Sequence, residues 1–297
     1  MIAAYDVPRL VVDSANFDRS FDQRPFGYEH NLSGLDLFSE PSLRALAARY
    51  DRDFMVAASA PTPATKFYSV PYGSHTPLEA FDRLDSGNQR ILLKMPENHD
   101  RRYRDLLHTL FEQVVALRGG LRGERVERLA SSILISSAEA ITPFHFDPEI
   151  SFFFQISGEK VYHLYAPSVL SEAELERFYV MGIVNIGQVE LAGRDPKSEY
   201  VFRLVDGKGM HQPQNCPHWV ETRANRSVSY VFSFETETTR SLGRTRAFNH
   251  YMRRCRLTPA PLGARPGLDR AKSWAMRVAI PLRKSIGRGI GALRSRR

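Results

Sequence analysis

The stretch Thr142–Lys160, TPFHFDPEISFFFQISGEK, decides how the rest of the chain is interpreted. It places His145 and Asp147 two residues apart, and side chains two apart on a strand point to the same face. A further histidine, His218, follows 71 positions after Asp147 in the strand-like segment GKGMHQPQNCPHWV. Two imidazoles and one carboxylate can hold Fe(II) and leave other coordination positions open. The sequence therefore predicts a metal site at His145, Asp147 and His218.

Two other histidines compete for the third ligand position. His163 lies three residues after Lys160, so on a strand it points to the opposite face. His211 precedes His218 by seven, again an odd separation on an unbroken strand. Both are expected to pack in the core or at the surface. The alternative to any metal site is a partly buried His145 beside a surface Asp-Pro turn, because His-x-Asp alone also arises by chance.

The order of motifs around these residues is more specific than the histidines alone. TPxHxD is followed by FxQxxGxK and then by a glycine-rich strand that ends in PHWV. This order resembles the JmjC-related cupin-like oxygenases, in particular the branch with the asparaginyl hydroxylase of the hypoxia pathway. The resemblance covers residues 131–234, about a third of the chain. It implies an Fe(II)- and 2-oxoglutarate-dependent dioxygenase, a hydroxylase that consumes O2 and acts on a protein side chain or a small molecule.

The same resemblance suggests residues for the cosubstrate. Lys160 occupies the place of the lysine that binds the distal carboxylate of 2-oxoglutarate, and Thr142 matches a threonine that hydrogen-bonds to it. Ser151 stands where related enzymes often have an asparagine, which puts that contact in doubt. Arg226 is the rival anchor, because many other 2-oxoglutarate oxygenases use an arginine after the distal histidine. The alternative for Lys160 is a solvated lysine beside a hairpin turn.

Short apolar runs with period 2 dominate from Ser131 to Phe234, whereas helical patterns precede them. About eight short strands predict a mainly β protein with flanking helices and a double-stranded β-helix core of the cupin or jelly-roll type. The clearest helix lies at 100–118, and a shorter one at 171–179 interrupts the strands. We expect an α/β flanking region at 1–125, a JmjC-type barrel at 126–240 and a basic extension at 241–297.

Charge separates the chain into two parts. From Arg240 onward there are 16 basic residues and one acidic residue, so this segment carries +15 while the rest carries −7. The negative charge makes nucleic acid an unlikely ligand for the body before Arg240, although a local basic patch could still exist there. Two cysteines, no signal-peptide pattern and no long apolar run predict a cytoplasmic protein.

Residues 264–297 contain apolar positions at near-helical spacing opposite basic positions. A basic amphipathic helix suits an anionic membrane surface, which would make the protein peripheral to a membrane. A disordered, solvated tail and a nucleic-acid-binding tail are the alternatives. The stripe consists of Trp274, Val278, Leu282, Ile286, Ile290 and Leu293.

Two other functions compete with the oxygenase. One is a metal-binding cupin without 2-oxoglutarate chemistry, which would need a fuller set of histidine and glutamate ligands. The other is a non-catalytic cupin that acts as a binding or regulatory module through its basic tail. The complete triad and Lys160 favour the enzyme.

Overall fold

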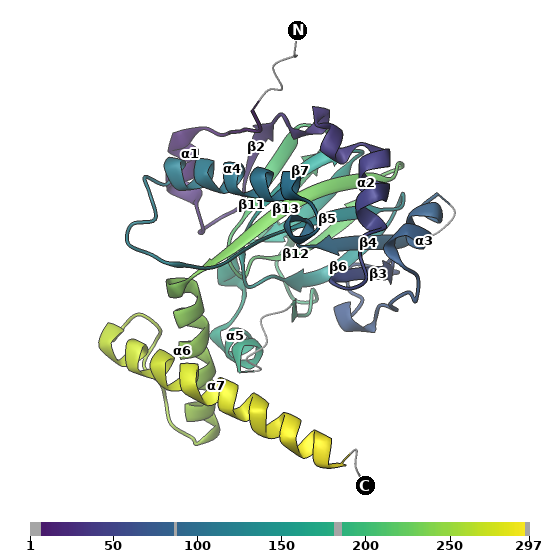
Figure 1. Cartoon of the computed structure of the whole chain (residues 1–297). Helices are drawn as coiled ribbons and strands as arrows, with labels where there is room; N and C mark the ends of the chain where they lie inside the picture. The colour runs from purple at the N-terminus through teal and green to yellow at the C-terminus, as the bar shows by residue number, and fades with distance from the viewer. Residues whose placement is uncertain (1–6, 86–87, 181–185, 295–297) are drawn as a thin grey trace. The chain divides into compact units, whose positions relative to one another are not determined.

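The computed structural model describes residues 7–85, 88–180 and 186–294, with the side chains of 281–294 left undescribed. The chain forms two compact units. The larger one comprises Met1–Val169 and Ile186–Glu235, and the smaller one comprises Leu170–Asn185 and Thr236–Arg297. Most of the predicted flanking region and barrel thus belongs to the larger unit (Figure 1).

Two β-sheets form the larger unit. Their strand orders are β1-β2-β11-β7-β13-β5-β4-β3 and β10-β8-β12-β6-β9. Neighbouring strands run antiparallel, as β7 does with β11 and β12 with β6. The eight-stranded sheet contains β1 Leu10–Val11, β2 Phe26–His30, β3 Phe54–Ala58, β4 Gln89–Lys94, β5 Val126–Ser136, β7 Ile150–Ser157, β11 Lys208–Gln212 and β13 Ser227–Thr236. The five-stranded sheet contains β6 Ile141–Phe146, β8 Lys160–Tyr165, β9 Gly187–Gln188, β10 Glu199–Leu204 and β12 Pro217–Thr222.

Four helices accompany these sheets, and their starts are set by capping side chains. Asp100, for example, accepts a hydrogen bond from the backbone N–H of Arg102 and so begins the longest of them, α4. Its buried residues form one apolar stripe that packs into the main core. The four are α1 Ser14–Ser20, α2 Glu40–Ala47, α3 Pro77–Asp82 and α4 Arg101–Leu117.

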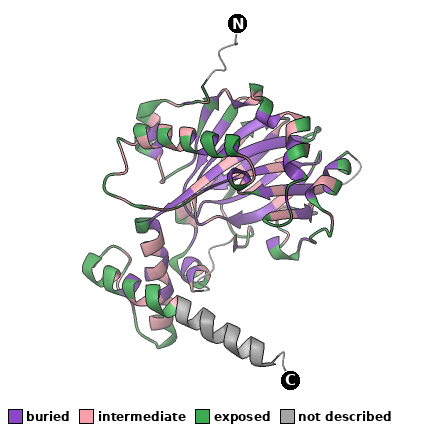
Figure 2. Ribbon diagram, in the orientation of Figure 1, coloured by how far each residue is buried: buried purple, intermediate pink, exposed green. Residues whose placement is uncertain are grey.

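Strand β7 shows how the sequence pattern creates two cores. Phe152 and Phe154 point into the larger core, which α4 also lines. Phe153 points the other way, into a smaller cluster with Tyr162 of β8 and Val220 of β12. Both faces of β7 are therefore covered, and Figure 2 shows buried residues along the central strands. The predicted mainly β fold with flanking helices and a jelly-roll core is confirmed.

A tight turn joins β7 to β8 and places the lysine of the FxQxxGxK motif. Gly158 has a φ of +72°, which favours glycine, and a Cβ there would collide with the backbone carbonyl of Arg226. Lys160 then begins β8, and it is directly opposite Thr222 of β12. Leu164 is opposite His218 in the same pair of strands. Because these pairs are four residues apart, Lys160 and His218 face the same side of the sheet.

The smaller unit is helical and includes a helix that the sequence pattern did not reveal. α6 buries small and polar residues, among them Gly243, whose missing Cβ leaves room for the ring of Tyr179. Lys272 of α7 donates a hydrogen bond to Asn249 of α6 at 2.8 Å. Among the described residues, no helix combines the length and apolar content needed to cross a membrane. The three helices are α5 Glu172–Tyr179, α6 Glu237–Arg254 and α7 Pro266–Arg294.

Candidate metal centre

The three predicted ligands converge in the larger unit. His145 of β6 and His218 of β12 are directly paired across the sheet, and Asp147 follows the end of β6. The Nε2 atom of His145 is 3.9 Å from Oδ1 of Asp147, and that of His218 is 3.7 Å from Oδ2. One ligand atom from each residue lies within 4.8 Å of the others, a spacing suited to one metal ion.

Backbone carbonyls fix both imidazoles with Nε2 toward the centre. His145 Nδ1 is 2.7 Å from the carbonyl oxygen of Pro143, and His218 Nδ1 is 3.0 Å from that of Cys216. A carbonyl only accepts hydrogen bonds, so in each ring Nδ1 donates its proton. The lone pair is thereby left on Nε2, which is the usual arrangement of a metal-binding histidine.

The electrostatics of the centre also suit a divalent cation. Burial lowers the pKa of His145 to about 3, with the neighbouring His218 as the next cause, and burial also lowers the pKa of His218. Both rings are therefore neutral at pH 7 and able to bind a metal. Nearby, burial and then the charge of Asp147 raise the pKa of Glu149 to about 7, although Arg128 forms an ion pair with it. A metal ion would relieve this concentration of negative charge.

Two residues beside the ligands were missed by the sequence analysis. The Nε2 of Gln212 donates a hydrogen bond to Oδ2 of Asp147 at 3.3 Å. The Oε1 of Gln212 is buried and has no donor among the described residues, so a donor bound to a metal at this site would fit it. The ring of Phe67 lies 4.7 Å from that of His145 and covers it. Neither residue belongs to a recognisable motif, and both reach the centre only through the fold.

Gln212→Ala is expected to weaken metal binding by about 10- to 100-fold, because Asp147 loses the partner that orients it. Titration calorimetry with Mn(II) on the metal-free protein measures this change directly. Gln23→Ala serves as the matched control, since Gln23 is exposed. Equal Mn(II) affinity in wild type and Gln212→Ala would show that Asp147 is oriented without this bond.

Thr142 and Lys160, which the sequence predicts to bind the cosubstrate, lie on β6 and β8, the strands on either side of β12. His218 pairs with His145 and Val220 pairs with Thr142, so a two-residue step on β12 spans three residues on β6. This β-bulge brings Thr142 and His145 to the same face despite their odd separation. Lys160 is 3% exposed and has no acidic partner among the described residues. A further cation, Arg90 of β4, donates from Nη1 to Oγ1 of Thr142 at 3.0 Å.

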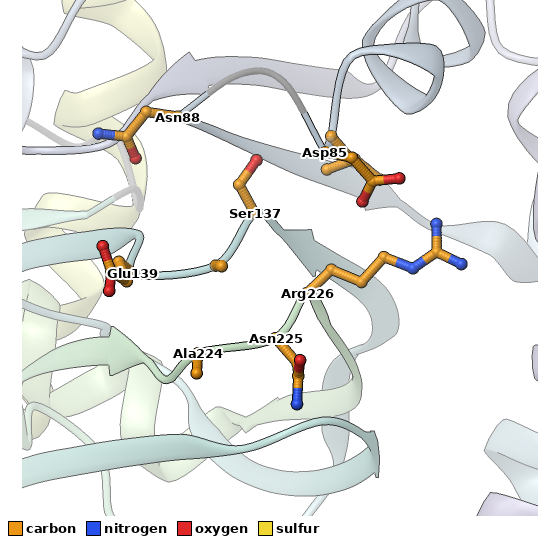
Figure 3. Close-up of a pocket in the computed structure, with 9 residues that line it drawn as sticks. Asp85, Asn88, Ser137, Glu139, Ala224, Asn225 and Arg226 are labelled. Carbon is orange, nitrogen blue, oxygen red and sulfur yellow. The ribbon is translucent and has the colours of Figure 1, made fainter.

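Ser151 and Arg226 lie in different surroundings. Ser151 is buried on β7 directly opposite Gln212, the residue that contacts Asp147. Arg226 precedes β13 and forms an ion pair with Glu40 at the surface, where its side chain is 43% exposed. Figure 3 shows it at the rim of a pocket lined by Ser137, Asn225 and other residues, none of them a predicted metal ligand.

The competing histidines do not join the ligand cluster. His163 stacks on Trp219 with ring centroids 3.7 Å apart, and its Nδ1 lies 3.2 Å from a carboxylate oxygen of Glu199. Both ring nitrogens of His211 have partners: Nδ1 donates to the carbonyl of Ser151, and Nε2 accepts from the backbone N–H of Asp22. Each histidine is therefore held by other contacts. For His163 this agrees with its parity, whereas His211 lies on β11 of the larger sheet and His218 on β12 of the smaller one, so the count of seven along one strand does not apply.

Comparison with known proteins shows similarity in structure but not in sequence. No family model matches the chain, and no curated protein matches it. Solved structures of YcfD from Escherichia coli superimpose with a TM-score of 0.54 at 18% identity, over 92% of this chain and 69% of that one. YcfD, described as a ribosomal oxygenase, has also been solved with cobalt and 2-oxoglutarate, at a TM-score of 0.54 over 68% of its length. A complex with cobalt and succinic acid gives 0.50 at 17% identity.

These neighbours confirm the predicted fold. The chain has the architecture of YcfD, and the His-Asp-His cluster lies on strands of its smaller sheet and directly after one of them. The donor set itself, two neutral imidazoles and one carboxylate, fits a mononuclear divalent metal. The chain therefore shares the fold of YcfD.

Proposed function

We propose that this protein is an Fe(II)- and 2-oxoglutarate-dependent dioxygenase that hydroxylates a protein side chain or a small molecule. The observation that carries the proposal is the convergence of His145, Asp147 and His218, with both Nε2 atoms free to bind a metal. The complex of YcfD with cobalt and 2-oxoglutarate supports the choice of cosubstrate. Bound Fe(II) would use O2 and 2-oxoglutarate to hydroxylate carbon: one oxygen atom of O2 would enter the product and the other would enter succinate, with release of CO2.

The residues of this chain bind and orient the reactants. His145, Asp147 and His218 would hold the metal with one ligand atom each, and a set of three protein ligands would leave positions for the cosubstrate and O2. Lys160 and Thr142 bind the distal carboxylate of 2-oxoglutarate with a charge-assisted hydrogen bond and a neutral one. The buried aromatic cluster around Phe153 excludes water from the space between the two sheets. Pro143 and Cys216 hold the imidazoles in place through their carbonyls.

The direct test is O2-dependent succinate formation from 2-oxoglutarate by the purified protein with Fe(II). Uncoupled turnover without a substrate is expected, and it should stop when Fe(II) is chelated or O2 is removed. A protein that binds Fe(II) but forms no succinate in the presence of ribosomal proteins and metabolite mixtures would be a cupin of another kind. Mass spectrometry of the same mixtures would find a +16 Da product and so identify the substrate class.

We propose that the protein is cytoplasmic and that α7 contacts an anionic membrane surface. Both cysteines, Cys216 and Cys255, are free, which supports a reducing compartment. On α7 Lys272, Ser273 and Met276 are buried, whereas Trp274 and Val278 are 70% and 47% exposed. The apolar stripe thus begins on the side of the helix that is open to solvent. Basic residues at 283–297 extend the positive charge of the chain beyond it.

Deleting 281–297 is expected to reduce sedimentation with phosphatidylserine liposomes by at least about tenfold, because six basic residues are lost and each contributes about 1 kcal/mol. Succinate formation should not change, since the centre lies in the larger unit. Trp274→Ala, in the full chain, should weaken the same binding. Equal sedimentation of all three proteins would show that the tail is solvated and does not bind the membrane. Binding to RNA instead of liposomes would favour the nucleic-acid-binding alternative.

A further inference from the structure

Arg90 is a buried cation that no motif of the sequence identifies. It lies on β4, is 7% exposed and belongs to the opposite sheet from Thr142. Its Nε donates to the carbonyl of Ala58 at 3.2 Å, and its Nη1 donates to Oγ1 of Thr142 at 3.0 Å. These two bonds hold the guanidinium between β3 and β6. Arg90 is therefore a fixed positive charge next to a residue proposed to bind 2-oxoglutarate.

Arg90 and Lys160 share a region without a counter-ion. Neither cation has a carboxylate within ion-pair distance among residues 7–85, 88–180 and 186–294. Burying an unpaired charge costs several kcal/mol, and an anion bound between the two groups would offset that cost. Lys160 and Thr142 face the same side of the smaller sheet from the two strands that flank β12, and Arg90 bonds to Thr142 from the opposite sheet, so the three residues together suit an anion.

The groups near Lys160 determine whether Lys160 or Arg90 loses its proton first. Arg90 of β4 is the charged group near Lys160, and Tyr162 of β8 is a titratable group on the same face. Thr222 of β12 and Thr142 of β6 are polar, uncharged groups on the same face as Lys160. Burial, and then the charge of Arg90, lowers the pKa of Lys160 to about 7. Burial lowers the pKa of Arg90 only to about 10, so Arg90 remains charged at neutral pH.

We propose that Arg90 is the permanent charge of the cosubstrate pocket, and that Lys160 takes up one proton from solvent as the distal carboxylate of 2-oxoglutarate binds. The neutral amine of Lys160 becomes an ammonium that donates to the carboxylate, while Arg90 keeps its proton and orients Thr142. The inference rests on the proposed function, because it takes 2-oxoglutarate as the anion. Arg90 is thus a positioning residue that acts through Thr142.

The change in the pKa of Lys160 on binding determines how the affinity for 2-oxoglutarate depends on pH. The pKa of Lys160 is about 7 in the free protein and rises when a carboxylate binds beside it. Binding is therefore strongest below pH 7, where the lysine already carries its proton. Above pH 7 the dissociation constant should rise by up to about tenfold per pH unit, until the pKa of the complex is reached.

The test is anaerobic titration calorimetry of 2-oxoglutarate binding to the Mn(II)-loaded protein between pH 6 and pH 9. Repeating the titration at pH 8.5 in buffers with different ionisation enthalpies measures the proton uptake, expected to be close to one per site. Lys160→Arg should bind with little change over this pH range, because its charge is permanent. Arg90→Gln should move the onset of weakening to higher pH, because the repulsion on Lys160 is removed. Lys197→Ala, an exposed lysine, should match wild type.

Three results would overturn the proposal. If wild type binds 2-oxoglutarate with the same affinity at every pH and takes up no proton, Lys160 is charged before binding. If Arg90→Gln has the wild-type pH profile, Arg90 plays no part in the pocket. If wild type binds Mn(II) but no 2-oxoglutarate at any pH, the proposed function itself fails, and this inference fails with it.

Discussion

Replacing His145, Asp147 or His218 by alanine is expected to abolish tight Fe(II) binding and succinate formation while the protein remains folded. Each residue supplies one of three ligand atoms that lie within 4.8 Å of one another. Loss of a residue that hydrogen-bonds to a metal ligand lowers the metal affinity by about 10- to 100-fold. Loss of a ligand itself should therefore lower the metal affinity by more than about 100-fold. Mn(II) binding by electron paramagnetic resonance and Fe(II)-dependent succinate formation measure the two effects.

His163→Ala is the matched control, because His163 stacks on Trp219 outside the ligand cluster. It should retain full metal affinity. Circular dichroism during thermal unfolding checks that each variant is folded. Loss of metal in His163→Ala together with its retention in His218→Ala would show that the ligand assignment is wrong.

The metal ligands could be predicted because their geometry is local or follows from strand periodicity. His145 and Asp147 are two residues apart at the end of one strand, and His218 lies in a second strand-like segment. The sheets themselves could be predicted from short runs of aromatic and β-branched residues, although a central strand such as β7 is buried on both faces and does not alternate. The order of motifs, which resembles that of known oxygenases, then favoured a jelly-roll over other β folds.

The surroundings of the centre could not be predicted, because they depend on contacts between distant strands. Thr142 and His145 are three residues apart, a separation that would put them on opposite faces of a regular strand, and the bulge between β6 and β12 brings them to the same face. Arg90 is 52 residues from Thr142 in the sequence, and it meets Thr142 only because two sheets face each other. Gln212 likewise reaches Asp147 across 65 residues.

Helix α6 could not be predicted from the sequence for a different reason. Its buried positions include Thr239, Gly243, Thr245 and Asn249, so it has no apolar stripe for a periodicity test to find. Hydrogen bonds replace much of the apolar packing there, as in the bond from Thr245 to the backbone carbonyl of Asp269. The predicted extension at 241–297 is therefore largely helical, with α6 followed by α7.

Lys160→Ala should raise the 2-oxoglutarate concentration needed for turnover by a large factor. A buried carboxylate that loses its charged partner is destabilised by about 2–5 kcal/mol, which corresponds to about 30- to 5000-fold in affinity. Lys160 is buried and has no acidic partner among the described residues, so its amino group is available to the ligand. Metal affinity should be nearly unchanged, because Leu164 rather than Lys160 is opposite the ligand His218. Mn(II) binding and the apparent KM for 2-oxoglutarate separate the two effects.

Arg226→Ala decides between the two candidate anchors in the same assay. Its guanidinium is paired with Glu40 at the surface, so removing it should leave the apparent KM for 2-oxoglutarate unchanged. Lys160→Met tests whether packing alone accounts for the effect, because methionine has a similar length without the charge. It should behave as Lys160→Ala does. A large rise in KM in Arg226→Ala together with a silent Lys160→Ala would place the anchor after the distal histidine and contradict the pocket described between Thr142, Arg90 and Lys160.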